Sequence, residues 1–187
     1  MPAVSTNDLK NGMSLNLPEG LYSVVEFQHV KPGKGGAFVR TKLKNVRTGA
    51  VLERTYRADE KLEQAIIDKR EMQYLYTEGT DYVFMDNTTF DQMQVTGASL
   101  GDAARYVKEG DSVILQLYNG SIVGVDLPAA VELEVTETEP GVQGDRVSGA
   151  RKPATLETGH QVQVPLFVNT GDRVKVDTRT GEYLTRV

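Results

Sequence analysis

Near the start of the chain, two runs of residues with strand-like patterns flank a segment of proline and glycine. The first run, 21–30, is rich in β-branched and aromatic residues, and the second, 37–44, alternates apolar with basic side chains. Between them lies Lys31-Pro-Gly-Lys-Gly-Gly36, a composition typical of a tight hairpin connection. The pattern predicts a β-hairpin that holds the amine of Lys34 at its tip.

This loop has two interpretations. In the functional one, the amine enters a narrow space, because glycine carries no side chain that would keep a partner's backbone away. The expected support for Lys34 then comes from its neighbours: Lys31, Pro32, Gly33, Gly35 and Gly36. The alternative is an ordinary glycine-rich turn with a solvated lysine. A phosphate-cradling P-loop fits poorly, since it needs Ser or Thr and a helix after the lysine.

Short strands and turn signals divide the chain into three regions of similar size. In residues 1–65, strand patterns at 14–17, 21–30, 37–46 and 50–57 predict a small β-barrel, and Asp59 is expected to cap a helical turn through Ala65. In residues 66–129, hairpins are expected around Glu78-Gly79 and Asn119-Gly120. Asp102 is expected to open a short helix, 103–109, that ends at Gly110.

Residues 130–187 predict a third barrel, in which Val131–Val135 alternates and Thr-Gly pairs separate further strands. An internal echo supports this division. Gly110-Asp111-Ser-Val113 recurs as Gly171-Asp172-Arg-Val174, with every matched position offset by 61 residues. The offset indicates two related barrels of about 60 residues each, and the alternative is coincidence among common turn residues.

The composition excludes several kinds of chemistry. The 187 residues contain no cysteine, which excludes disulfides, thiolate metal sites and cysteine nucleophiles. The two histidines, His29 and His160, are too far apart in sequence to suggest a shared site. We therefore expect no metal and no cofactor. The N-terminal residues lack a signal-peptide pattern and no apolar run approaches a membrane span, so a cytoplasmic protein without membrane contact is expected.

Charge is distributed unevenly along the chain, whose net charge is −5. Residues 1–65 hold ten Lys/Arg against seven Asp/Glu (+3), residues 66–129 hold four against ten (−6), and residues 130–187 hold seven against nine (−2). Within residues 31–57, eight basic residues accompany one acid, Glu53. Basic residues at alternating strand positions predict a phosphate-facing surface, and a merely solvated face is the alternative.

These features favour an RNA- or ribonucleoprotein-binding protein over an enzyme. Small barrels with OB-like topology bind RNA through their surfaces. The sequence shows no nucleophile elbow and no spacing that predicts a metal site or paired carboxylates. Two alternatives stay open. One is a general single-strand RNA-binding protein, and the other is a hydrolase that uses Asp and Glu pairs.

The residues in these patterns resemble bacterial elongation factor P over essentially the whole chain. The tip 31–35, Lys-Pro-Gly-Lys-Gly, is similar to the family's functional loop. Residues 152–171, Lys-Pro-Ala-Thr-Leu-Glu-Thr-Gly-His-Gln-Val-Gln-Val-Pro-Leu-Phe-Val-Asn-Thr-Gly, match the family's signature at every required position. The C-terminal segment 175–186 also resembles the family.

The resemblance implies an all-β fold of three small domains in an L-shaped arrangement that mimics tRNA. The expected domains are an SH3-like one at 1–65, followed by two OB-like ones at 66–129 and 130–187. It implies a monomeric factor, not an enzyme, that binds both ribosomal subunits beside the P-site peptidyl-tRNA, between the P and E sites. It further implies that the factor rescues ribosomes stalled on consecutive prolines.

The resemblance also implies roles for individual residues. Lys34 would reach toward the acceptor end of the tRNA and is a candidate for a lysine-modifying enzyme, since eukaryotic and archaeal relatives carry hypusine at the corresponding position. The other expected contacts with tRNA or rRNA are made by Arg40, Lys42, Lys44, Arg54, Tyr183 and Arg186. For Tyr183, packing inside the barrel is the alternative. The loop expected near the E-site mRNA codon is Gly144-Asp145-Arg146, and many members have Thr in place of Arg146.

Overall fold

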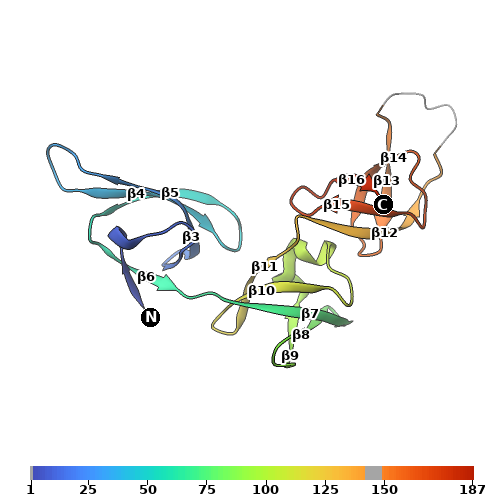
Figure 1. Ribbon diagram of the computed structural model, residues 1–187, viewed down its shortest axis with the longest axis horizontal. Coiled ribbons are helices and arrows are strands. Elements are labelled where there is room, and N and C mark those ends of the chain that lie inside the picture. Colours follow the sequence, from blue (N-terminus) through green and yellow to red (C-terminus); the bar gives the residue numbers. More distant parts are fainter. Residues whose placement is uncertain (1, 142–148) are drawn as a thin grey trace. The chain divides into compact units, whose positions relative to one another are not determined.

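A computed structural model describes residues 2–141 and 149–187, and it confirms the predicted all-β fold class. The chain divides into two compact units, one made of Met1–Lys69 with Gln116–Gly124 and the other of Arg70–Leu115 with Val125–Val187. Figure 1 shows short strands joined mostly by hairpin loops in both units. The division into three domains at residues 65/66 and 129/130 stays a prediction. In the described residues, no helix is long and apolar enough to cross a membrane.

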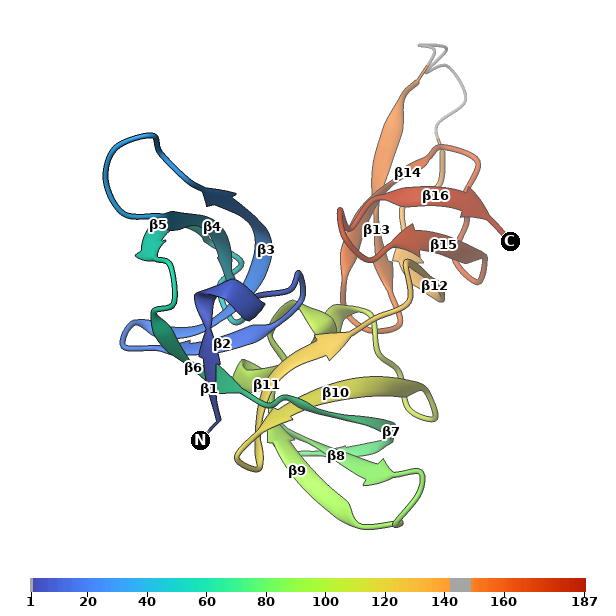
Figure 2. The same ribbon diagram turned by 60° about the vertical axis from the view of Figure 1, so that its left-hand side comes forward.

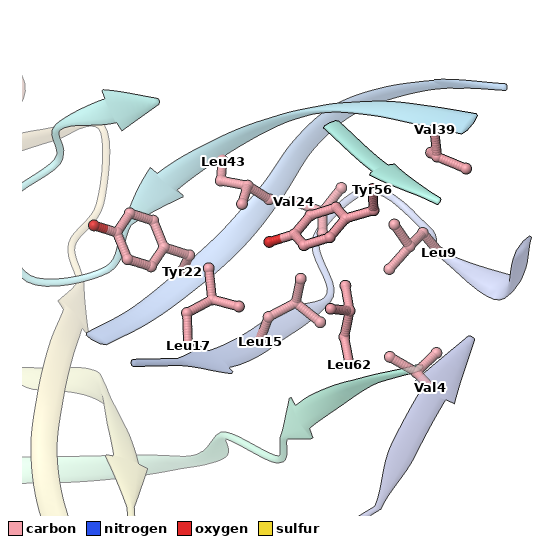
Figure 3. Packing of buried hydrophobic residues seen from close by; sticks show 10 residues of the cluster. All are labelled: Val4, Leu9, Leu15, Leu17, Tyr22, Val24, Val39, Leu43, Tyr56 and Leu62. Carbon is pink, nitrogen blue, oxygen red and sulfur yellow. The ribbon is translucent and has the colours of Figure 1, made fainter. Parts of the chain in front are cut away.

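The first unit contains a six-stranded antiparallel sheet in the order β1-β6-β2-β3-β4-β5. Its strands are β1 (Ala3–Ser5), β2 (Ser14–Leu17), β3 (Gly20–Val30), β4 (Phe38–Asn45), β5 (Val51–Arg57) and β6 (Lys61–Ala65), and a short 3-10 helix, η1 (Thr6–Asp8), follows β1. A bulge in β3 between Val24 and Glu26 allows this long strand to bend. The sheet encloses a core of aliphatic residues with Tyr22 and Tyr56, seen in Figure 3.

The helical turn expected from Asp59 through Ala65 is wrong, because this segment forms a turn and then strand β6. Asp59 lies at φ 64° in the turn that precedes the strand. β6 pairs with both β1 and β2, and it buries Leu62 and Ala65. Pairing with strands distant in sequence has overridden the weak local preference for a helix.

The middle sheet has the order β11-β10-β7-β8-β9. Its elements are β7 (Asp68–Glu78), β8 (Asp81–Asp86), β9 (Gln92–Thr96), α1 (Gly97–Leu100), the 3-10 helix η2 (Gly101–Arg105), β10 (Ser112–Tyr118) and β11 (Ser121–Asp126). Both predicted hairpins are present. The helix predicted at 103–109 is wrong: helical structure starts at Gly97, where the Thr96 hydroxyl accepts a hydrogen bond from the Ser99 amide, and η2 ends at Arg105.

The C-terminal sheet has the order β14-β13-β12-β15-β16. Its strands are β12 (Ala130–Thr138), β13 (Arg151–Leu156), β14 (Gln161–Pro165), β15 (Arg173–Asp177) and β16 (Tyr183–Arg186). The apolar side of the sheet forms one buried cluster, the C-terminal core, made of Tyr106, Leu133, Val135, Ala154, Leu156, Val162, Val164, Val168, Val174 and Val176. Tyr106 is the member that comes from the segment between η2 and β10.

The 61-residue echo in the sequence is confirmed by matching hydrogen bonds. The Tyr74 amide donates to the carbonyl of Asp111 and its carbonyl accepts from the amide of Gly110, both at 2.8 Å. The residues 61 positions later make the same two bonds, also at 2.8 Å. The Val135 amide donates to the carbonyl of Asp172, and the Val135 carbonyl accepts from the amide of Gly171. Each of the two strands also carries a β-bulge directly after the residue that makes these bonds. The matching turn residues therefore serve one repeated structural purpose and are not a coincidence.

Candidate nucleic-acid interface

The loop that carries Lys34 connects β3 to β4. The last paired residues of the two strands are Val30 and Phe38, so the loop consists of residues 31–37. The hairpin prediction is confirmed, although the connection is longer than a tight turn. Every residue from Lys31 to Gly36 is exposed, and the loop extends beyond the strands as the blue segment between β3 and β4 in Figure 2. The Lys34 side chain is thus accessible to a partner.

The three glycines of this loop differ in what the fold requires of them. Gly35 adopts φ +100°, a conformation that residues with side chains rarely adopt. Gly33 and Gly36 have no such requirement. At all three positions, a Cβ atom would meet nothing within 4 Å. The folded protein therefore needs glycine at one position, and it leaves space for a side chain at the other two.

Strand β4 presents its basic residues on one face. Val39, Thr41 and Leu43 are buried, with exposed fractions of 0%, 3% and 0%. The alternating residues Arg40, Lys42 and Lys44 therefore point to the opposite, outer face. This confirms that the alternating pattern in the sequence marks a strand with one basic side.

Acidic residues lie closer to this basic face than the sequence count indicated. Lys42 is the register partner of Glu26 on β3 and of Glu53 on β5, so acidic residues flank it on both sides. Arg40 has no acidic partner in the register, and its guanidinium lies 5.5 Å from the centre of the Phe38 ring. These strands line a hollow of ≈ 370 Å³, bounded by Glu26, Phe27, Gln28, Arg40, Thr41, Lys42, Glu53, Arg54 and Thr55.

Arg54 is engaged by an acid in this structure. Its two terminal nitrogens bind the two carboxylate oxygens of Glu19, at 2.6 and 3.3 Å. The hydrogen bonds from Arg54 hold the pKa of the Glu19 carboxyl below its usual range, and they raise the pKa of Arg54. A phosphate that approaches Arg54 would have to compete with Glu19. The tRNA contact expected for Arg54 stays a prediction.

The expected contact residues of the C-terminal sheet differ in their surroundings. Tyr183 packs against the C-terminal core, which agrees with the alternative considered for this residue. Arg186 lies over the ring of Phe167, 5.0 Å from its centre, and 3.7 Å from a carboxylate oxygen of Asp172. Sequence reasoning missed Phe167, whose side chain is exposed. Gly144, Asp145 and Arg146 lie outside the described residues.

The described residues contain no group of three or more His, Asp or Glu side chains that could hold a metal ion. The hollow on β3, β4 and β5 is open and lined by charged and polar side chains. Such a surface suits a macromolecule with exposed phosphates better than a small apolar ligand, which prefers an enclosed apolar pocket.

Three family models match consecutive parts of the chain. One described as the Elongation factor P (EF-P) KOW-like domain matches residues 5–62, one described as the Elongation factor P (EF-P) OB domain matches residues 67–125, and one described as Elongation factor P, C-terminal, matches residues 131–186. Together they cover both compact units and support the small β-domains expected from the sequence.

Close relatives match over nearly the full length. The protein named Elongation factor P from Acidothermus cellulolyticus is 60% identical over 182 residues, which cover 97% of each chain. The one from Streptomyces avermitilis is 61% identical over 184 residues, which cover 98% of each chain. Among solved structures, a eukaryotic translation initiation factor 5A from Methanococcus jannaschii has a TM-score of 0.54 at 24% identity, over 67% of this chain and 94% of that chain.

Proposed function

The chain belongs to the elongation factor P family of translation factors, and from this premise we propose that it binds the ribosome beside the peptidyl-tRNA, between the P and E sites. There it promotes peptide-bond formation at stalled consecutive prolines by positioning the P-site tRNA through the Lys34 loop. The observation that carries the proposal is the exposed loop 31–37 at the end of a strand with one basic face.

The mechanism we propose is positioning, without acid–base chemistry. Proline is a constrained participant in peptide transfer, so its reactive geometry is rarely sampled. A factor that holds the end of the P-site tRNA in a near-attack arrangement lowers the entropic part of the barrier. The ribosome itself supplies the catalyst, which agrees with a family of translation factors that are not enzymes.

The positive charges of the loop and of β4 support the proposed contacts with RNA. The Lys34 ammonium is a compact cation on a flexible stem, suited to phosphate and ribose oxygens. Arg40 and Lys44 lie on the outer face of β4 and have no acidic partner in the strand register. We infer that these two residues bind backbone phosphates more strongly than Lys42, which lies between two acids, and Arg54, which is paired with Glu19.

Further partners follow from the same proposal. Lys34 is accessible to a lysine-modifying enzyme because the whole tip of the loop is exposed. Arg186 and Tyr183 would lie near the anticodon stem and the small subunit, and the segment 144–146 near the E-site codon of the mRNA. The protein would act as a monomer in the cytoplasm, where ribosomes translate.

The test is reconstituted translation of a reporter with three consecutive prolines. It compares no factor, native protein, unmodified recombinant protein and the Lys34→Ala variant. We expect only protein with an intact Lys34 to restore full-length product, while Lys34→Ala keeps the wild-type melting temperature, because the exposed side chain contributes little to stability. The difference between native and recombinant protein measures the need for a modification.

Two other outcomes would change the assignment. Normal activity of Lys34→Ala would overturn the loop mechanism. If none of the proteins relieves the pause while all of them bind free RNA with equal, salt-sensitive affinity, the chain is a general single-strand RNA-binding protein.

A further inference from the structure

Three hairpin loops of this chain share one set of hydrogen bonds. In residues 45–50, the side-chain oxygen of Asn45 accepts from the amides of Arg47 and Thr48, the Gly49 amide donates to the Asn45 carbonyl, and the Ala50 amide donates to the Thr48 hydroxyl. Residues 86–91 and 177–182 make the corresponding bonds at each position. The loops therefore form a matched set within one chain.

The three loops differ at their fifth position. This residue needs a positive φ, which is 75° at Gly49 and 77° at Gly181. The third loop places Phe90 there, at φ 63°. A bulky side chain is a genuine outlier in this region, where glycine has no steric cost. Position 90 thus carries a backbone strain that its two counterparts avoid.

Packing within the protein does not account for this phenylalanine. Phe90 is 69% exposed, so it gains little from packing in the core. The loop itself is held by Asp86, which accepts from the amides of Thr88 and Thr89 and pairs with Arg70 at 3.4 Å. An exposed aromatic ring on a strained backbone, within a loop held by these hydrogen bonds, is a preorganised contact for a partner.

We propose that Phe90 is an anchor that inserts into a pocket on a basic protein surface of the ribosome. The charge of the middle region favours protein over RNA as the partner. Within the loop, Asp86 is paired with Arg70, and the exposed Asp91 follows Phe90 directly; over residues 66–129 the sequence holds four basic and ten acidic residues. An acidic surface repels RNA phosphates and is complementary to a cationic protein. Aromatic residues that fill a partner's pocket dominate the energetics of such interfaces.

This inference rests on the proposed binding to the ribosome but does not depend on the Lys34 mechanism. Figure 2 shows the loop between β8 and β9 as a separate hairpin end of the middle sheet, distinct along the chain from the β3–β4 loop. We expect Phe90 to affect association with the ribosome, and Lys34 to affect the reaction that follows. The two proposals can therefore fail independently.

The first experiment measures the affinity of the full-length protein for purified ribosomes at one fixed salt concentration. Phe90→Gly and Phe90→Asn both suit a positive φ, so each should melt at or above the wild-type temperature. We expect both to bind about tenfold more weakly or worse, as truncation of an interface anchor does. The matched control is Ile114→Ala, which removes an exposed apolar side chain from an ordinary strand position and should leave affinity unchanged.

The second experiment identifies the class of the partner. A photo-crosslinking phenylalanine analogue at position 90 is irradiated in the complex with the ribosome. We expect crosslinks to a ribosomal protein of net positive charge. Crosslinks to rRNA or tRNA, or wild-type affinity in both Phe90 variants, would overturn the inference and leave the Lys34 proposal intact. If the wild-type protein itself fails to bind ribosomes, the proposed function fails instead.

Discussion

Among the glycines around Lys34, one is required by the backbone conformation of the loop, and the other two could be required only by a binding partner. Gly35 is required by its φ of +100°, whereas Gly33 and Gly36 have space for a side chain in the free protein. If the loop enters a narrow RNA cleft, a methyl group at either of these two positions would meet the partner and not the protein. Stability and activity should then respond differently to the same substitution.

We predict that Gly33→Ala and Gly36→Ala leave the free energy of unfolding within about 0.5 kcal/mol of wild type, because nothing is displaced in the fold. Each should lower the yield of full-length product from the three-proline reporter several-fold. Thermal melting and the reconstituted assay measure the two effects. Gly35→Ala is the control that should cost more than about 1 kcal/mol of stability, because alanine is strained at this positive φ. Full activity in both Gly33→Ala and Gly36→Ala would show that the loop tip does not enter a narrow space.

The sequence predicts some properties of single residues and misses others for a physical reason. The outward orientation of Arg40, Lys42 and Lys44 was predictable, because alternation along one strand is a local property. The acidic residues that lie beside the basic ones were not predictable from the sequence. Glu26 reaches Lys42 through strand register, and Glu19 reaches Arg54 across 35 positions of sequence. Such pairs depend on the register between neighbouring strands, and the residue pattern of a single strand does not specify that register.

At the scale of elements, strands were predicted well and short helices poorly. Runs such as 21–30 and 37–46 have both the composition and the period of strands, and the structure confirms them. The segment 59–65 has a capping residue, but its pairing with β1 and β2 decides its structure. The turn at Phe90 is not predicted by the sequence pattern, because Phe90 stands where the loops 45–50 and 177–182 have the glycine of a Thr-Gly pair. The shared signal is an Asn or Asp with a Thr three residues later.

The repeated loops lead to a prediction about acid stability. In the loop 177–182, hydrogen bonds from the amides of Arg179 and Thr180 hold the pKa of the Asp177 carboxyl below its usual range. A carboxyl with a lowered pKa stabilises the folded state fully above its unfolded pKa of about 3.9, and this stability is lost as the pH falls through the lower folded value. Asp177 therefore contributes to a loss of stability below about pH 4.

We predict that Asp177→Asn preserves the loop at neutral pH, because Asn45 accepts the same two hydrogen bonds through its amide oxygen. The variant lacks a titrating group, so its melting temperature should fall less than that of wild type between pH 5 and pH 2. Melting curves by circular dichroism across this range test the prediction. The control is Asp177→Ala, which loses the hydrogen bonds and should be less stable at every pH. Parallel curves for wild type and Asp177→Asn would contradict the assigned role.

At the scale of the whole molecule, the C-terminal sheet packs against the part of the middle region that lies in the same compact unit, Arg70–Leu115. Tyr106 follows η2 directly in the chain. It is 5% exposed and packs within the C-terminal core. Its ring lies 5.4 Å from that of His160, between centroids. The Thr158 hydroxyl donates to the Arg105 carbonyl, and Lys108 pairs with Glu157 at 3.6 Å. The segment Arg70–Leu115 and the C-terminal sheet should therefore unfold together.

We predict that Tyr106→Ala lowers the free energy of unfolding by about 3–5 kcal/mol, as loss of a buried aromatic side chain does. Because the cavity lies where the two sheets meet, the substitution should also split a single urea transition into two, or reduce its m value. Urea unfolding followed by circular dichroism measures both quantities, and Tyr106→Phe is the control that keeps the ring. A loss under about 1 kcal/mol with an unchanged m value would show that the sheets fold independently of this contact. In that case, Tyr106 would contribute little to the stability of either sheet, and the repeat would provide two separately stable copies.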